Sequence, residues 1–581
     1  MHARNRTWPL GSDPAERCRQ RTMPVEGGDG STLSLDFTTG VLDPRLTFTR
    51  GGNATFINSS GLVEWAAANM FANSAWNDAT ATPSGWSAFG LSATATVAIA
   101  SDPEARTIAV TTGAGNQPFL FVAPTVSQGI VYTASVEIVS VTHGSGGATE
   151  EVQYNQVLAA PFSSTFAYYM NGSSVGASAK VTQTGVLTCV YVAASSSQIR
   201  IGFASAPRNN CSVTVKAPQH QPGEAKTRTA FFRRTAAEGA YYGPRFDHDP
   251  TTLAPRGLLI EGSASNLLNW SESFATSGGT NNNWADTSIT RNSTNNTDPA
   301  SGTTALRVTA SAGNGTIIST SAIGTSAERT FSIWLRRVSG TGNIQYTLDN
   351  GSTYTTQAIT SSWVRYTFAA TTAAQRVGIR IVTSGDSIEL WGAQLEAGSG
   401  DSSYIPTGAS TGSRAYDHCY ATGANFTSWF SVGAGTMVVV SDNIKNNVQN
   451  LGATISDDSS SNYVRMGFKV GGASNEYLLT TVGGPSSFQG AADSGYAPPL
   501  NTVYRMAYAW DANNFGIVAN GGTVATDLSG TLAGAGVLNR LVVGGDFVAI
   551  PNDIYFKNGH IRSLKYWPTR LANAQLQALT T

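Results

Sequence analysis

The sequence is poor in charged residues. Asp, Glu, Lys and Arg make up 13% of the 581 residues, against about 25% in a typical soluble protein. The formal net charge is −1. Nucleic-acid binding needs clusters of Lys and Arg that displace counterions from phosphates, and an anionic membrane surface attracts the same residues. The composition therefore argues against nucleic acid as a partner and favours uncharged ligands.

Long apolar runs and a cysteine framework are also missing. The chain has neither a secretory signal nor an apolar run of about 18 residues or more, so we expect a soluble protein made in a cytoplasm, without membrane insertion. The four cysteines are too few and too scattered for a disulfide scaffold or a zinc site. Cys189 and Cys211 are close enough in sequence to pair, but two small buried hydrophobes are the favoured interpretation.

Helical periodicity is confined to the last residues. Strand-like alternation, broken by turn residues at intervals of about 8–12 positions, fills most of the chain. The exception is the stretch 570–579, whose helix-forming residues follow Pro568 and predict a short closing helix. The predicted fold class is all-β, with tandem antiparallel β-sandwich modules and one C-terminal helix.

One pattern occurs twice. Asn69 is followed by Met70-Phe71 and then by two tryptophans, and Asn266 is followed by Leu267-Leu268 and again by two tryptophans. A strand-like run begins at Tyr132 in one copy and at Arg329 in the other, 63 residues after the respective asparagine. The first copy contains about 21 additional residues between Val141 and Met170, for which we expect a long loop. Repeated sandwiches favour a display or binding protein over a single-site enzyme.

Five regions follow from these patterns. Residues 1–35 mix arginines with prolines and glycines and predict an N-terminal docking arm, and residues 36–67 predict a β-meander that continues in residues 236–262. The two copies of the repeat, at residues 68–235 and 263–410, predict one sandwich module each. Residues 411–581 predict a further sandwich that ends with the helix.

Several short sequence motifs resemble motifs of known protein families. Residues 411–581 resemble a laminin-G or concanavalin A-like sandwich. The resemblance is carried by Met506–Asp511, Val518–Gly521 and Gly559–Trp567. The second repeat resembles the jelly-roll, carbohydrate-binding-like modules of bacteriophage tail fibres and head fibres, through Asn266–Leu268, Trp391–Glu396 and Tyr404–Thr407. Two further segments are similar to sequences that link the modules of such proteins, namely Pro244–Pro250 and Arg256–Glu261. The first repeat is then an additional module inserted into that family's pattern.

The resemblance implies a fibre or spike, displayed on the outside of a phage or phage-like virion, that adheres to host cell-surface polysaccharide. Neutral glycans bind to aromatic rings surrounded by amides and hydroxyls, which suits this composition. Aromatic residues at strand spacing also fill sandwich cores, and that structural role is the alternative for each one. The candidate glycan-binding residues are Trp270, Trp284, Trp76, Trp86, Tyr463, Trp510 and Trp567.

Metal binding and catalysis have weaker support in the sequence. The family resemblance implies a possible structural calcium (Ca2+) near the chain ends of a jelly roll, where Glu261, Glu272 and Glu396 would converge. The triplet Asp247-His248-Asp249 is interpreted as a solvated linker, and His560 as half-exposed scaffold. Neither the stacked repeats typical of depolymerases nor a Gly-x-Ser-x-Gly motif is present, so we expect no enzyme activity.

The function predicted from the sequence is adhesion without turnover. The N-terminal arm would bind other virion proteins, and the fibre would be a homo-oligomer, with a trimer favoured by the resemblance and a fivefold arrangement left open. Two alternatives remain: a purely architectural virion component such as a capsid decoration, collar or tail protein, and a polysaccharide depolymerase.

Overall fold

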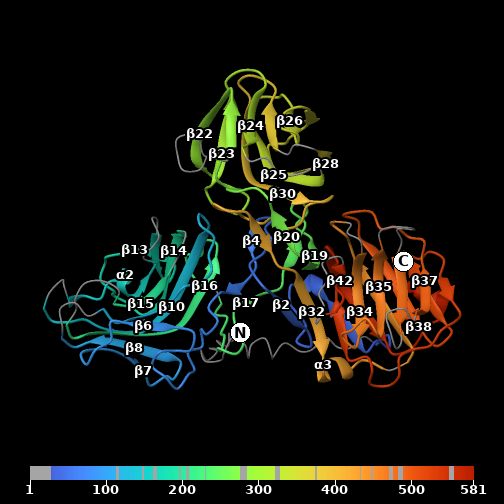
Figure 1. Cartoon of the computed structure of the whole chain (residues 1–581), viewed down its shortest axis with the longest axis horizontal. Coiled ribbons are helices and arrows are strands. Elements are labelled where there is room, and N and C mark those ends of the chain that lie inside the picture. The colour runs from blue at the N-terminus through green and yellow to red at the C-terminus, as the bar shows by residue number, and fades with distance from the viewer. Residues whose placement is uncertain are drawn as a thin grey trace, which may run out of the picture.

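The computed structural model has an all-β architecture, in agreement with the predicted fold class. Figure 1 shows three β-rich bodies that meet at a central junction. The structure describes residues 28–581 except for 113–116, 147–149, 161–165, 195–197, 204–208, 229, 275–283, 321–326, 373–375, 432, 446–448, 470–475, 482–487 and 548–554. Most of the predicted N-terminal arm, with Cys18, therefore lies outside the described residues.

The C-terminal sandwich consists of two packed sheets. The first has the order β18 (Phe246–His248), β19 (Pro255–Ile260), β42 (Gly559–Trp567), β33 (Gly435–Ser441), β38 (Tyr504–Trp510), β39 (Phe515–Ala519) and β40 (Ala525–Asp527), and β1 (Leu33–Asp36) also pairs with β42. The second has the order β2 (Thr47–Arg50), β32 (Asp417–Thr422), β41 (Arg540–Val543), β34 (Gln449–Ser456), β35 (Tyr463–Lys469), β36 (Glu476–Thr481) and β37 (Phe488–Asp493). Three separate stretches of the chain thus build one sandwich.

This assembly changes two expectations. Residues 33–35, assigned to the arm, belong to β1, whose Leu33 lies opposite Tyr566 of β42. Strand β2, expected within a local meander, pairs instead with β32, so that Phe48 lies opposite Cys419. The predicted hairpin between β3 (Thr55–Ile57) and β4 (Val63–Trp65) is confirmed.

Module 1 (residues 68–235) and module 2 (residues 263–410) are both β-sandwiches. The sheets of module 1 contain β7 (Ala95–Ile99), β8 (Ala105–Val110), β16 (Cys211–Pro222), β10 (Val131–Thr142), β14 (Gly185–Val192), β12 (Phe166–Met170) and β13 (Ser173–Val175), packed on β6 (Ser87–Phe89), β9 (Phe119–Val122), β15 (Ile199–Gly202) and β11 (Leu158–Ala159). Those of module 2 contain β22 (Ile289–Asn296), β23 (Ala305–Ala310), β30 (Ser387–Ala397), β25 (Ala327–Ser339) and β28 (Val364–Thr372), packed on β21 (Trp284–Thr287), β24 (Gly315–Ser319), β29 (Gly378–Ile381), β26 (Ile344–Thr347) and β27 (Thr355–Gln357). The shared order of their central strands agrees with the predicted repeat.

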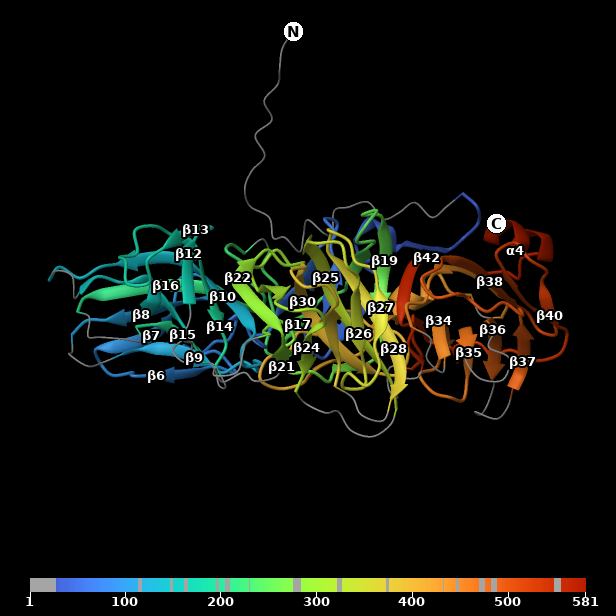
Figure 2. The ribbon, with the colours of Figure 1, turned by 90° about the horizontal axis from the view of Figure 1, so that it is seen from above.

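Both modules are inserted into the C-terminal sandwich. The chain leaves for module 1 along β5 (Ala68–Asn69) and returns along its partner β17 (Tyr241–Tyr242). It leaves for module 2 along β20 (Ala264–Asn266) and returns along β31 (Gly412–Arg414), again as an antiparallel pair. Figures 1 and 2 show module 1 and the C-terminal sandwich on opposite sides of the junction, with module 2 between them.

The two repeat asparagines make matching hydrogen bonds. The Oδ1 atom of Asn69 accepts from the backbone N–H of Phe71 and His220, and that of Asn266 accepts from Leu268 and Leu395. Each Nδ2 donates to two backbone carbonyls, those of Pro218 and Phe232 in module 1 and those of Ala393 and Ile405 in module 2. Each asparagine therefore ties the first residues of its module to the last strand, which explains why the motif occurs in both copies.

The additional segment of module 1 is partly ordered into strands. Strands β12 and β13 form a hairpin that extends the larger sheet through β14, and α2 (Tyr154–Val157) precedes them. The expectation of a long loop is corrected for these residues. Tyr168 and Met170 of β12 are buried in the core, so apolar contacts of the inserted segment stabilise its folded conformation.

The remaining helices are short. They are η1 (Phe37–Thr39), α3 (Ala424–Thr427) and α4 (Asn573–Thr580). The predicted closing helix is confirmed in α4, whose Leu576 is fully buried against Ala507 and Val518 on the outer face of the C-terminal sandwich. Within the described part of the chain, no helix has the length and apolar composition needed to cross a membrane.

The hydrogen bonds of the two repeat asparagines generate a testable prediction. Asn266→Ala leaves two backbone N–H groups and two carbonyls of module 2 without these partners, each group costing about 1–3 kcal/mol when buried. Because water will form hydrogen bonds with some of these backbone groups, we expect a loss of about 2–4 kcal/mol in the free energy of unfolding, measured by denaturant titration.

Asn269→Ala is the matched control, because the side chain of Asn269 donates only to the backbone oxygen of Ala409 and is half-buried. Equal losses for the two variants would contradict the assigned role of Asn266.

Candidate functional site

Six of the seven aromatic candidates lie in hydrophobic cores. The buried rings are Trp76, Trp86, Trp284, Tyr463, Trp510 and Trp567. Trp76 and Trp86 pack edge to face at 5.1 Å in module 1, and Trp510 packs near Tyr566 in the C-terminal sandwich. A buried ring has no free face for a sugar, so the structure corrects the expectation that these six residues form stacking platforms.

Trp270 differs from the other six because it is half-buried and borders a cavity. It has a φ of 54°, in the left-handed region that non-glycine residues rarely adopt. Its N–H donates to the carbonyl of Gly408 at 2.8 Å. Its ring lies against Gly129 of module 1, where an added Cβ would come within 2.5 Å of the ring. The side chain is therefore fixed at the boundary between the two modules.

We call this cavity the junction cleft. It has a volume of about 460 Å³ and is lined by the β3–β4 hairpin and by both modules. The hairpin contributes Trp65, module 1 contributes Gln128, and module 2 contributes Trp270, Glu272 and Thr304. Two half-buried indoles, an amide, a hydroxyl and a carboxyl group thus surround one space. Of these residues, Trp270 was predicted from the sequence as a glycan candidate and Glu272 only as a calcium ligand.

Glu272 is the ionisable group of the junction cleft. Its Oε1 accepts a hydrogen bond from the hydroxyl of Tyr404 at 3.2 Å, and that hydroxyl also contacts Ser271 Oγ at 2.7 Å. Burial and the nearby charge of Asp298 raise the pKa of Glu272 to about 7, although the Tyr404 hydrogen bond opposes the shift. Glu272 is therefore partly protonated near neutral pH and can donate as well as accept a hydrogen bond.

The three glutamates proposed as calcium ligands contact consecutive residues. Glu396 accepts from Ser402, Glu261 from Ser403, and Glu272 from Tyr404. Within the described residues, however, no group of three or more His, Cys, Asp or Glu side chains is placed to hold a metal ion. The positive charges next to Glu261 come from arginine side chains.

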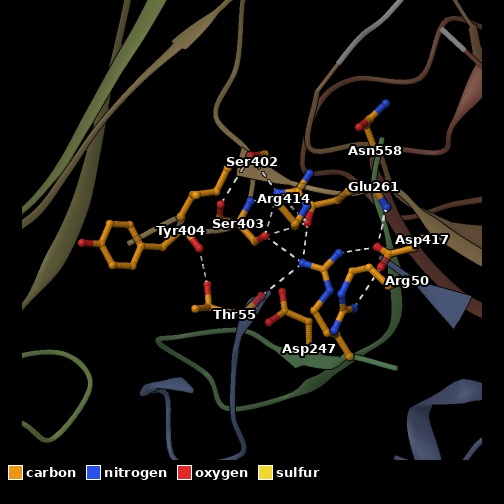
Figure 3. A network of polar contacts seen from close by, with 12 residues as sticks. Arg50, Thr55, Asp247, Glu261, Ser402, Ser403, Tyr404, Arg414, Asp417 and Asn558 are labelled. Atoms are coloured by element: carbon orange, nitrogen blue, oxygen red, sulfur yellow. Dashed lines mark hydrogen bonds and ion pairs between the residues drawn. The ribbon is translucent and has the colours of Figure 1, made fainter. Parts of the chain in front are cut away.

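A buried network of charged side chains surrounds Glu261 (Figure 3). Arg245 binds Glu261 at 2.5 Å and also pairs with Asp417, whose other oxygen accepts from Arg50 at 3.0 Å. Arg414 lies 3.4 Å from Glu261. Burial alone would lower the pKa of Arg245, but the charges of Asp417 and Glu261 raise it well above its ordinary value. The network is internally neutralised and has a structural role.

His560 was expected to be half-exposed, and the structure corrects this. Its side chain is 1% exposed and lies between two carboxylates, with Nδ1 2.7 Å from Asp442 and Nε2 2.8 Å from Asp247. Burial alone would lower the pKa of His560, but the two aspartates raise it to about 9. Asp247 also accepts from the backbone N–H of Ile57. The first residue of the triplet 247–249 is thus a buried contact and not a solvated linker.

A second cavity lies beside this histidine. It has a volume of about 370 Å³ and is lined by the β3–β4 hairpin, the base of module 2 and the C-terminal sandwich. Trp363 is half-buried here, and Trp334 also lines the cavity, with Arg365 stacked 4.7 Å from its ring. The charged groups of this cavity are paired, since Arg365 binds Asp401 and Arg256 binds Asp249.

The cysteines have no role at these cavities. Cys189, Cys211 and Cys419 are buried, and Cys189 and Cys211 do not form a disulfide with each other. Burial raises the pKa of Cys189 to about 12, which leaves its thiol protonated and unreactive. The preferred interpretation of small buried hydrophobes is therefore confirmed for these two residues.

Comparisons with known proteins give only distant structural matches. No protein family and no curated protein matches the chain. Among solved structures, a CBM40 of the Ruminococcus gnavus IT-sialidase bound to α2,3 sialyllactose has 17% identity and a TM-score of 0.23, over 26% of this chain and 84% of that one. Domain 4 of AbnA, a GH43 extracellular arabinanase from Geobacillus stearothermophilus in complex with arabinotriose, has 14% identity and a TM-score of 0.22, over 32% and 84%. A heptameric SAP-like pentraxin from Limulus polyphemus has 15% identity and a TM-score of 0.20, over 26% and 73%.

The contacts of His560 with Asp247 and Asp442 predict a pH dependence of stability. The folded-state pKa of about 9 lies above the ordinary value of 6.5, so the folded protein holds a proton that the unfolded chain releases between these values. The stability that these contacts contribute is complete below pH 6.5 and is lost as the pH rises through 9. We expect His560→Gln to remove this part of the pH dependence, as measured by unfolding between pH 6 and 10.

His248→Gln serves as the control, because His248 is half-buried in the neighbouring cavity. A wild-type stability that is flat across this pH range would contradict a protonated His560.

Proposed function

We propose that this chain is a non-catalytic adhesin that binds polysaccharide in the junction cleft. We further propose that it is displayed as a fibre or spike on the exterior of a phage or phage-like particle. The observation that supports glycan binding is the placement of Trp65 and Trp270 around one cavity with the polar groups of Gln128, Glu272 and Thr304. The location on a virion rests on the family resemblance of the sequence.

The chemistry of the junction cleft suits a neutral sugar. Sugar rings present C–H faces that stack on indoles and hydroxyls that exchange hydrogen bonds with amides, hydroxyls and carboxyls. A polar but weakly charged protein surface adds little electrostatic attraction, so affinity at one site is expected to be modest. Several copies held on one particle would raise the effective concentration and compensate for this.

Binding at the junction cleft is testable with two variants from opposite walls. Trp270→Ala removes a stacking face, and Gln128→Ala removes an exposed amide of module 1. We expect Trp270→Ala to weaken binding at least tenfold, equivalent to about 1.4 kcal/mol, and Gln128→Ala to weaken it by a smaller factor. The measurement is titration against intact bacteria and their extracted surface polysaccharides.

Phe89→Ala is the matched control, since Phe89 is 57% exposed on module 1 and does not line the junction cleft. Unchanged binding by both cleft variants would remove the proposed site. Absence of any saturable binding by the wild type would favour the architectural alternative, in which the protein contacts only other virion components.

One observation favours a depolymerase as a second candidate. A carboxyl group with a pKa near 7 in a cleft is the kind of group that acts as a general acid on a glycosidic bond. Asp298, the nearby carboxylate, accepts from Ala300, Gly302 and Thr304 and does not line the cleft. Release of reducing ends in the binding assay, abolished by Glu272→Gln, would establish this alternative.

The oligomeric state is part of the proposal. A fibre or spike is expected to be a symmetric homo-oligomer, with a trimer favoured by the family resemblance. Light scattering of the purified full-length chain should give a mass three times that of one chain, whose mass is 60.7 kDa. A monomer at the concentrations that support binding would contradict the proposed multivalent adhesion.

A further inference from the structure

A third cavity lies beside the junction cleft and shares one wall with it. It has a volume of about 430 Å³ and is lined by the β3–β4 hairpin, by module 1 and by the segment before β18. Trp65 lines both cavities, and the consecutive residues Pro222 and Gly223 line one cavity each. We call the third cavity the side cavity. It adjoins the junction cleft at Trp65.

Trp65 is held firmly between the two spaces. It is the last residue of β4 and lies opposite Thr55 of β3. Its ring lies against Gly223, which has a φ of 84° and where an added Cβ would come within 2.6 Å of the ring. The backbone of Gly223 is fixed in turn, because its N–H donates to Val131 and its carbonyl accepts from Thr133 Oγ1 at 2.7 Å. The indole therefore has a defined position.

The side cavity offers the same chemistry as the junction cleft. Its aromatic wall includes Phe56, Phe232 and Phe246, and Phe232 stacks on Tyr241 at 4.8 Å. Two amides also line the side cavity, and Gln219 Nε2 donates to Gln221 Oε1 at 2.8 Å. That contact orients the half-buried Gln221 side chain and leaves its own amide N–H₂ as a donor type suited to sugar hydroxyls.

We propose that the junction cleft and the side cavity are successive subsites of one groove, with Trp65 between them, and that the ligand is an internal stretch of several sugar units. Each volume falls within the range of about 300–1,000 Å³ typical of small-ligand sites. A single terminal sugar would fill only one subsite. A chain that passes Trp65 would contact module 1 on both sides of the ring, so affinity would grow with chain length.

This inference rests on the proposed function, and a length series tests the two separately. The probes are fragments of the polysaccharide that binds in the assay above, from a monosaccharide to an octasaccharide, titrated by calorimetry against the full chain. We expect the affinity to rise at least tenfold between the monosaccharide and the longer fragments and then to level off once both subsites are filled.

Two variants identify the subsites. Gln221→Ala should weaken the long fragments several-fold and leave monosaccharide binding in the junction cleft unchanged, whereas Trp65→Ala should weaken every fragment. Phe89→Ala again serves as the control.

An affinity that does not depend on chain length would overturn the groove and leave glycan binding in place. The same follows if Gln221→Ala changes no fragment, or weakens the monosaccharide as much as the octasaccharide. Absence of binding at every length would overturn the proposed function and the groove together.

Discussion

The buried charge network at the junction is the interaction on which the rest of the structure depends. It joins three guanidinium groups, of Arg50, Arg245 and Arg414, to the carboxylates of Glu261, Glu396 and Asp417, and all six residues are buried. They come from β2, from the segments flanking β18 and β19, and from β30, β31 and β32. Removing one partner of a buried pair leaves an uncompensated charge, at a cost of about 3–5 kcal/mol. The network therefore fixes the points where the modules leave the C-terminal sandwich.

This junction gives the candidate site its shape. Arg245 also donates to the carbonyl of Thr55 in the β3–β4 hairpin, and Thr55 Oγ1 donates to the carbonyl of Tyr404 at the base of module 2. The hairpin that carries Trp65 is thus held from both sides. Cavities between separately folded modules depend on the angles between the modules, and a rigid junction makes such cavities reproducible enough to serve as binding sites. Inserting both modules into one sandwich, with two connections each, supports the same geometry.

Much of the fold was predictable because its signals are local. Alternation and turn residues identified the strands, and the asparagines at 69 and 266 marked the two copies because each makes the same contacts within its own module. The completion of the C-terminal sandwich by β1, β2, β18 and β19 was not predictable, since Leu33 and its partner Tyr566 are more than five hundred residues apart. No local pattern encodes such a pairing.

The site was harder to predict than the fold. Residue type alone does not tell which face of a strand a ring occupies, so Trp510 and Trp270 were equal candidates, although Trp510 is buried in a core and Trp270 borders a cavity. Trp65 lies within the predicted meander of residues 36–67, and its importance depends on Gly223, which lies in a distant part of the sequence. His560 was misjudged for the same reason, because Asp247 and Asp442 reach it from other segments.

The most direct test of glycan binding at the junction is a crystal structure of the full chain with an oligosaccharide fragment of the bound polysaccharide. We predict electron density for sugar rings between Trp65 and Trp270, with hydrogen bonds to Gln128 or Glu272. Density for the sugar on an outer sheet face, with the junction cleft empty, would contradict binding at this site.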